Sequence, residues 1–328
     1  MKKLRVYLCL LVAAVLCVSL YAPRTTKAEG GGYAYIGGFP IGIVLDVGGL
    51  LVESVTGVET EYGTAYTEGL RRGDIIKSID GVEIDNCDDI SGMLNGSTVR
   101  LAVVRGGKDM ELEVTPIVEE YTGKPKLGVK IKDKLYGIGT VSFVRENGKY
   151  AALGHEIYDA ETNTHLPFSG GKICACKIVG IKHGEKGEAG AILASISADH
   201  GYGSIDCNNN FGIAGTLDST PSLIGERVQI ADRSEVKPGY AQIRTTVDGA
   251  PQFYDIEIIK ATKQLGRKEK GIIFRVTDKN LLKITGGVVR GMSGSPIIQN
   301  GKIIGAVTHV MLNDFTKGYA VYADCLNN

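Results

Sequence analysis

The stretch Gly-Met-Ser-Gly-Ser-Pro, residues 291 to 296, lies between two apolar runs, Ile284–Val289 and Ile297–Ile304. The runs predict strands, so the stretch itself predicts a tight turn between them. A serine flanked by glycines in such a turn exposes its hydroxyl, and neighbouring backbone N–H groups can be directed toward one point. We therefore interpret Ser293 as a candidate nucleophile, with the N–H groups of Gly291 and Ser293 as a candidate oxyanion hole.

A serine hydroxyl is a poor nucleophile at neutral pH and needs a base within hydrogen-bond reach, for which histidine is suited. His155 follows an apolar strand in Leu-Gly-His-Glu, where the glycine lets the backbone turn and present the ring. His309, after the serine turn, is the alternative base, and His155 would then be structural. Asp278 is the candidate carboxylate that orients the imidazole; alternatively it is the N-cap of a helical stretch, Lys279–Ile284.

The order histidine, aspartate, serine matches the chymotrypsin arrangement rather than that of subtilisin or the α/β-hydrolases. In residues 127–328, short β-like segments alternate with turns that contain Gly, Asn and Asp. Many short strands at this spacing favour a closed or sandwiched β architecture. The sequence therefore predicts a mainly β protein with a chymotrypsin-like double β-barrel peptidase domain over residues 127–328.

The composition limits the classes of partner. Lys and Arg (37) balance Asp and Glu (37), so no overall field favours nucleic acid, and we expect no nucleic-acid partner. Cys174 and Cys176 could share one face of a strand, but no second Cys or His pair stands at metal-finger spacing. We interpret these two residues as small apolar strand residues, and expect no metal and no cofactor.

The N-terminus predicts a signal or a membrane anchor. Lys2, Lys3 and Arg5 stand before or at the start of an uncharged apolar run, Val6–Ala22. Basic residues before an apolar segment are typical of secretion signals and of single anchors, and they keep the N-terminal end cytoplasmic. We assign residues 1–28 to this segment and expect the rest of the chain to be extracytoplasmic, either tethered or secreted.

Residues 37–116, after a linker at residues 29–36, resemble a PDZ domain. The resemblance is carried by Gly-Leu-Arg-Arg-Gly-Asp-Ile-Ile, residues 69–76, and by the Asp-Gly turn that follows it. It implies a small α+β domain with a groove that accepts an extended peptide as an added strand. A second linker, residues 117–126, would separate this domain from the peptidase domain. The expected peptide-binding residues are Gly38, Phe39, Ile41, Gly42 and Ile43.

The longest motifs resemble the SpoIVB peptidase family, the sporulation stage IV B proteases of spore-forming Firmicutes. The matching stretches are Tyr150–His155, Val276–Leu282 and Thr285–His309, and the anchor and PDZ module stand in the same order. The resemblance implies that His155 is the base, Ser293 the nucleophile and Asp278 the third member of the triad.

The same resemblance implies a serine endopeptidase of sporulation signalling. Family members process themselves and are secreted into the space between forespore and mother cell. There they cleave a membrane-bound regulatory complex, which leads to activation of a late mother-cell sigma factor. The PDZ domain is implied in self-recognition and target binding. The alternative is a catalytically weak or inactive PDZ adaptor that binds membrane-protein peptides.

Overall fold

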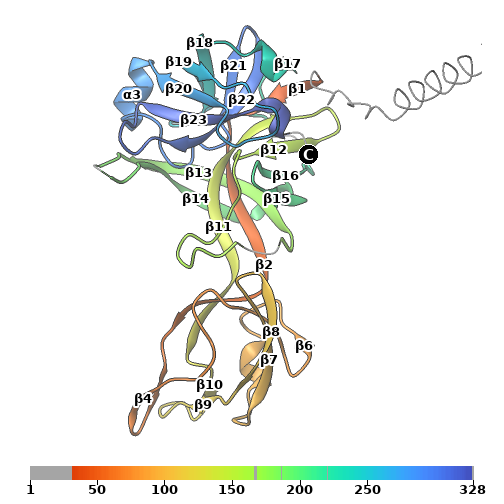
Figure 1. Cartoon of the computed structure of the whole chain (residues 1–328), viewed down its shortest axis with the longest axis vertical. Coiled ribbons are helices and arrows are strands. Elements are labelled where there is room, and N and C mark those ends of the chain that lie inside the picture. The colour runs from red at the N-terminus through yellow and green to blue at the C-terminus, as the bar shows by residue number, and fades with distance from the viewer. Residues whose placement is uncertain (1–31, 166–167, 186, 220, 327–328) are drawn as a thin grey trace, which may run out of the picture.

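The computed structural model describes residues 32–165, 168–185, 187–219 and 221–326. The expected signal or anchor, residues 1–28, lies outside these ranges. Within them, no helix has the length and apolar character needed to cross a bilayer. The described chain is mainly β, as predicted. Two long strands, β2 (Pro40–Val55) and β11 (Val129–Val144), run from an upper body of barrels to a smaller lower module (Figure 1).

Six antiparallel strands close into what we call the C-terminal barrel. Their hydrogen-bonded order is β18, β19, β20, β23, β22 and β21, and β21 pairs back to β18. Alternate residues of β18 (Ala241, Ile243 and Thr245) are buried, as the two-residue period of a strand requires. The strands are β18 (Gly239–Thr245), β19 (Gln252–Ala261), β20 (Ile272–Val276), β21 (Pro296–Gln299), β22 (Lys302–Val310) and β23 (Lys317–Tyr322).

A second ring of strands packs beside this barrel. In it β13, β2, β11, β12 and β16 pair in succession, and β14 pairs with β13. An isolated bridge between Gly203 and Leu217 joins β14 to the end of β16 and completes the ring. The remaining members are β12 (Lys149–Ala152), β13 (Gly171–Lys182), β14 (Ala191–Ser204) and β16 (Gly212–Thr216).

Short elements connect or flank the two rings. One of them, β1, pairs with both β11 and β17, and β17 runs parallel to β22. They are β1 (Tyr33–Ile36), β15 (Cys207–Asn209), β17 (Arg227–Ile230), the 3-10 helices η1 (Arg233–Glu235) and η2 (Ala323–Leu326), and helix α3 (Lys279–Thr285).

The N-terminal half of β2 belongs to the second ring, which differs from the predicted start of a PDZ domain at residue 37. The backbone N–H of Gly38 donates to Val141 O (2.7 Å), and a Cβ on Gly42 would lie 2.6 Å from the Ile196 side chain. These residues therefore form core rather than a peptide groove, and the predicted groove is not found here. All five expected peptide-binding residues are buried: Gly38, Phe39, Ile41, Gly42 and Ile43.

The lower module is inserted between the end of β2 and the start of β11 and has its own core. Leu50 and Val52 of β2 pack there with Ile131 of β11. The buried carboxylate of Asp74 accepts hydrogen bonds from Arg105 (2.7 Å) and from the N–H of Arg71. The module contains β3 (Val58–Thr60), β4 (Gly63–Ala65), β5 (Ile75–Ile79), β6 (Val82–Glu83), α2 (Ile90–Met93), β7 (Val99–Arg105), β8 (Lys108–Val114), β9 (Ile117–Val118) and β10 (Pro125–Lys126).

Candidate active site

The turn that carries Ser293 is fixed by its glycines. Gly291 and Gly294 have φ angles of 97° and 95°, in the left-handed region that favours glycine. A Cβ on Gly294 would lie 1.9 Å from Thr140 O, so no other residue fits. The predicted strand after the turn is β21. The run before it, residues 284–289, is instead the end of α3 followed by a bend, because Gly286 ends the helix in a left-handed conformation.

Two backbone N–H groups of this turn have no acceptor among the described residues: those of Gly291 and Ser293. The carbonyl groups of the same two residues are engaged. Thr140 donates its hydroxyl to Gly291 O (2.9 Å) and its N–H to Ser293 O (3.0 Å). The turn is thus held by its carbonyls while both amides stay available, which is what an oxyanion hole requires.

His155 is presented by a strained turn. Leu153 and Gly154 have φ angles of 70° and 78°, and a positive φ is uncommon for leucine. The Nδ1 atom of His155 lies 3.0 Å from the backbone oxygen of Glu156. Because a carbonyl oxygen can only accept, this contact places the hydrogen on Nδ1 and leaves the lone pair on Nε2 of the neutral ring. That tautomer is the one that a general base needs.

Ser293 and His155 line the same cleft, which has a volume of about 470 Å³. The Ser293 hydroxyl donates to Thr308 O (2.8 Å), so in this conformation it does not donate to a histidine. A rotation about χ1 would redirect it into the cleft. The apolar part of the lining includes Ala189, Val288, Val289, Val307, Val310 and Leu312.

His309 lines the cleft as well. Its ring centroid lies 5.2 Å from that of His155, with the planes tilted by 40°. Burial, with a smaller effect of His155 and of Lys270, lowers the pKa of His309 to about 4. Its Nδ1 atom is buried and has no hydrogen-bond partner among the described residues. The ring is therefore neutral at pH 7, and nothing in the described chain orients it as a base.

Asp278 lies at the start of α3. Its Oδ1 atom accepts from the N–H groups of Asn280 and Leu281, both at 2.9 Å. Among the described residues no hydrogen bond or ion pair joins it to either histidine of the cleft. The structure thus gives Asp278 the N-cap role that the sequence left open, and its role in the triad stays a prediction.

Sequence reasoning missed the groups that hold the cleft together, because most of them are backbone atoms. The carbonyl of Glu156 contacts His155, whereas the Glu156 carboxylate pairs with His165 (3.2 Å). Thr140 contacts the serine turn across 151 residues of sequence. A pattern of residue types carries no signal for a backbone oxygen or for such a distant contact.

A half-buried serine in a glycine turn, with a histidine in the same cleft, is the arrangement of a serine peptidase. The family model of the SpoIVB peptidase S55 matches residues 123–326. The chain therefore belongs to the SpoIVB peptidase S55 family, which makes it a serine peptidase of sporulation and confirms the resemblance seen in the sequence. No curated protein matches the sequence closely enough to count as a relative.

The lower module has a groove of its own, with a volume of about 440 Å³. One wall is α2 and the residue after it, with Ile90, Ser91 and Leu94, and another is the start of β11, with Val129 and Ile131. Residues 129–132 of β11 pair with β2 on one edge. Among the described strands none pairs with their other edge, so this stretch of backbone is open.

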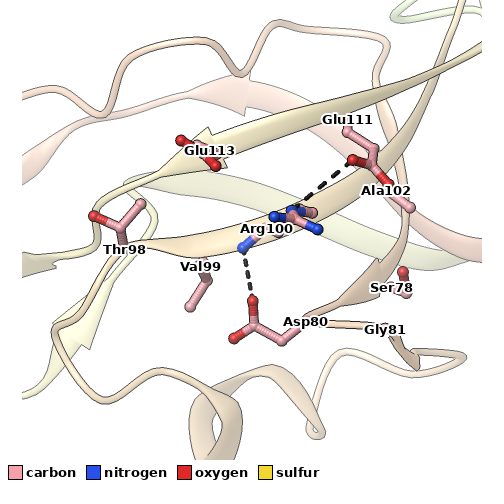
Figure 2. A pocket seen from close by; sticks show the side chains of 9 residues that line it. All are labelled: Ser78, Asp80, Gly81, Thr98, Val99, Arg100, Ala102, Glu111 and Glu113. Atoms are coloured by element: carbon pink, nitrogen blue, oxygen red, sulfur yellow. Dashed lines mark hydrogen bonds and ion pairs between the residues drawn. The ribbon is translucent and has the colours of Figure 1, made fainter.

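A second hollow of the lower module has a mainly polar lining and lies on the sheet of β5, β7 and β8 (Figure 2). Arg100 stands in its middle, and its backbone N–H donates to Asp80 (2.8 Å) while its guanidinium lies 3.9 Å from Glu111. Most of the side chains that line this hollow are polar. It therefore lacks the apolar wall that the groove beside α2 has.

Proposed function

We propose that the chain is an endopeptidase with a chymotrypsin-like double barrel, in which Ser293 is the nucleophile and His155 the general base. The observation that carries this proposal is that both side chains line one cleft beside two unpaired amides. The C-terminal barrel supplies the serine turn, and the second ring supplies the histidine. This division of the site between two barrels supports the chymotrypsin-like assignment.

In the proposed mechanism, the Ser293 hydroxyl turns from Thr308 O toward Nε2 of His155 and attacks the scissile carbonyl. His155 takes the proton and then gives it to the leaving amine. The N–H groups of Gly291 and Ser293 stabilise the oxyanion that forms. The backbone carbonyl of Glu156 holds the imidazole in the required tautomer, the role that an aspartate has in most triads.

The test is Ser293→Ala, with Ser295→Ala as the matched control in the same turn. Ser295 is buried, and its hydroxyl bonds to that of Thr245 (2.9 Å), so its loss affects stability rather than chemistry. Hydrolysis of labelled casein should fall by several orders of magnitude for Ser293→Ala only. Equal activity of Ser293→Ala and wild type, or no labelling of wild type by a fluorophosphonate, would leave the adaptor as the better reading.

For the lower module we infer a PDZ-like role, with the peptide in the groove between α2 and β11. Such a peptide would add a strand to the open edge of residues 129–132, and its alternate side chains would enter the apolar groove. This replaces the groove expected at residues 38–43, which are core. The module would then bind target peptides or a second copy of the chain, apart from the catalytic cleft.

The family and the N-terminal sequence support a proposal for the substrate and the place of action. We propose that the protein acts outside the cytoplasm, between forespore and mother cell. It would process itself and cleave a membrane-associated regulator, which would trigger a late mother-cell sigma factor. N-terminal sequencing of the fragments from wild type and from Ser293→Ala, expressed in one host, tests this. Fragments common to both come from signal removal, and fragments of wild type alone come from self-processing.

A further inference from the structure

The loop between β19 and β20, residues 262–271, is rich in basic residues, and we call it the basic loop. It carries Lys263, Arg267, Lys268 and Lys270 against the single carboxylate of Glu269, a net charge of +3, while the whole chain is neutral. All four cationic residues are exposed. The barrel therefore presents a locally positive surface that the overall composition conceals.

An apolar side chain stands at the tip of the basic loop. Leu265 has a relative exposure of 112%, the highest among the exposed large apolar residues of the described chain. The base of the loop is ordered, because the Thr262 N–H donates to Gly271 O (2.9 Å) and the Tyr322 hydroxyl donates to Thr262 O (2.9 Å). Leu265 is thus exposed to water on a loop whose base is fixed by hydrogen bonds.

The N-terminal segment enters the described structure at β1, which pairs with β17, and the chain continues from β17 into η1, which contacts this loop. Gly32 O accepts from the N–H of Ile230, and three residues further on Arg233 donates to Gly266 O (2.8 Å). The sequence before Gly32 contains the uncharged apolar run Val6–Ala22, and only residues 23–31 separate the two. Nine residues span at most about 30 Å, so a bilayer that holds this run would lie within about that distance of β1.

We propose that the basic loop seats on the surface of an anionic bilayer, with Leu265 in the interface and the lysines against lipid headgroups. Basic clusters next to a membrane segment are attracted by anionic lipids, and an exposed apolar side chain gains by leaving water. Lysine side chains can reach headgroups from such a position. This contact would fix the direction in which the catalytic cleft faces from the membrane. It does not rest on the catalytic proposal.

The chain has no tryptophan, so Leu265→Trp introduces a single fluorescent reporter into the full-length protein. The variant is reconstituted in phosphatidylcholine vesicles with and without phosphatidylglycerol, and brominated lipids serve as quenchers. The expected result is a blue-shifted emission that brominated lipid quenches in the anionic vesicles and that high salt reverses. Tyr136→Trp, at an exposed site on β11, is the matched control and should respond to neither lipid.

The charge requirement is tested in the Leu265→Trp background with Lys263→Gln and Lys268→Gln together. Each neutralised lysine should weaken binding of the basic loop to the bilayer roughly fivefold. The pair should therefore lower the ratio of membrane-bound to free loop roughly 25-fold. Emission of Leu265→Trp that matches Tyr136→Trp in both vesicles would overturn the proposal. A blue shift without quenching by brominated lipid would also overturn it, because the residue would then be covered by protein. Casein hydrolysis, measured in parallel, reports separately on the catalytic site.

Discussion

The catalytic cleft and the groove of the lower module are built in opposite ways. Around the cleft both rings are closed, and among the described residues the turn of Ser293 offers two amides without an acceptor. Along the groove a strand edge stays open over residues 129–132 and the neighbouring wall is apolar. Two fixed amides suit the stabilisation of one reacting carbonyl, whereas an open strand edge suits the binding of an extended peptide. On the proposed roles, bond cleavage and peptide binding would take place at separate sites of the chain.

The largest effect is expected from replacing each of the two histidines of the cleft in turn. We expect His155→Gln to lower casein hydrolysis by on the order of 10⁴-fold or more, because the base is lost. His309→Gln should have a much smaller effect, because a pKa lowered to about 4 makes this ring a weak proton acceptor and no described polar group contacts its Nδ1 atom. Thermal melts of both variants control for folding. The reverse ranking would make His309 the base and His155 a structural residue.

The groove side is tested by Ile90→Glu, which puts a charge on the wall formed by α2. Binding of a fluorescein-labelled hexapeptide of alternating valine and threonine should weaken roughly tenfold or more, since burial of an isoleucine is lost. Val82→Glu, at an exposed site on β6 that does not line the groove, is the control. Fluorescence anisotropy measures both.

The same peptide distinguishes strand addition from binding by side chains alone. N-methylation of alternate peptide nitrogens removes the donors that would pair with the open edge of β11. The methylated peptide should bind more weakly than the parent. Equal binding of both peptides would refute strand addition, and casein hydrolysis by Ile90→Glu at the wild-type rate would keep the two sites distinct.

The contrast also explains which parts could be predicted from the sequence. The serine turn follows from local chemistry, because Gly291 and Gly294 each need a backbone conformation that favours glycine. The groove was misplaced because the PDZ resemblance assigned residues 38–43 to the peptide-binding loop, whereas residues 40–43 pair with residues of β11 that stand about 100 positions later. Ring closure through distant pairs leaves no local signal, so the sequence could not show that the lower module is an insertion.

Asp278 has two possible roles in the sequence, as the N-cap of α3 and as the third member of the triad. The two roles can be separated by mutation. Asn caps a helix about as well as Asp but cannot stabilise a protonated histidine by charge. If Asp278 only caps α3, Asp278→Asn should keep its activity. Asp278→Ala should cost about 1 kcal/mol of stability, measured by denaturant unfolding. A loss of casein hydrolysis by orders of magnitude in Asp278→Asn, with unchanged stability, would instead restore the predicted triad.

The smallest effect is expected from the titration of His309. Its pKa is about 4 in the folded protein and near 6.5 when unfolded. Between these values the unfolded chain binds a proton that the folded chain does not, so stability should fall as the pH drops from about 6.5 to about 4. The ring is partly accessible to solvent, which limits the size of the effect. His309→Gln should flatten this part of the pH dependence of the melting temperature. If wild type and His309→Gln lose the same stability over this range, the histidine is not buried as a neutral ring, and the argument that reserves the base for His155 fails with it.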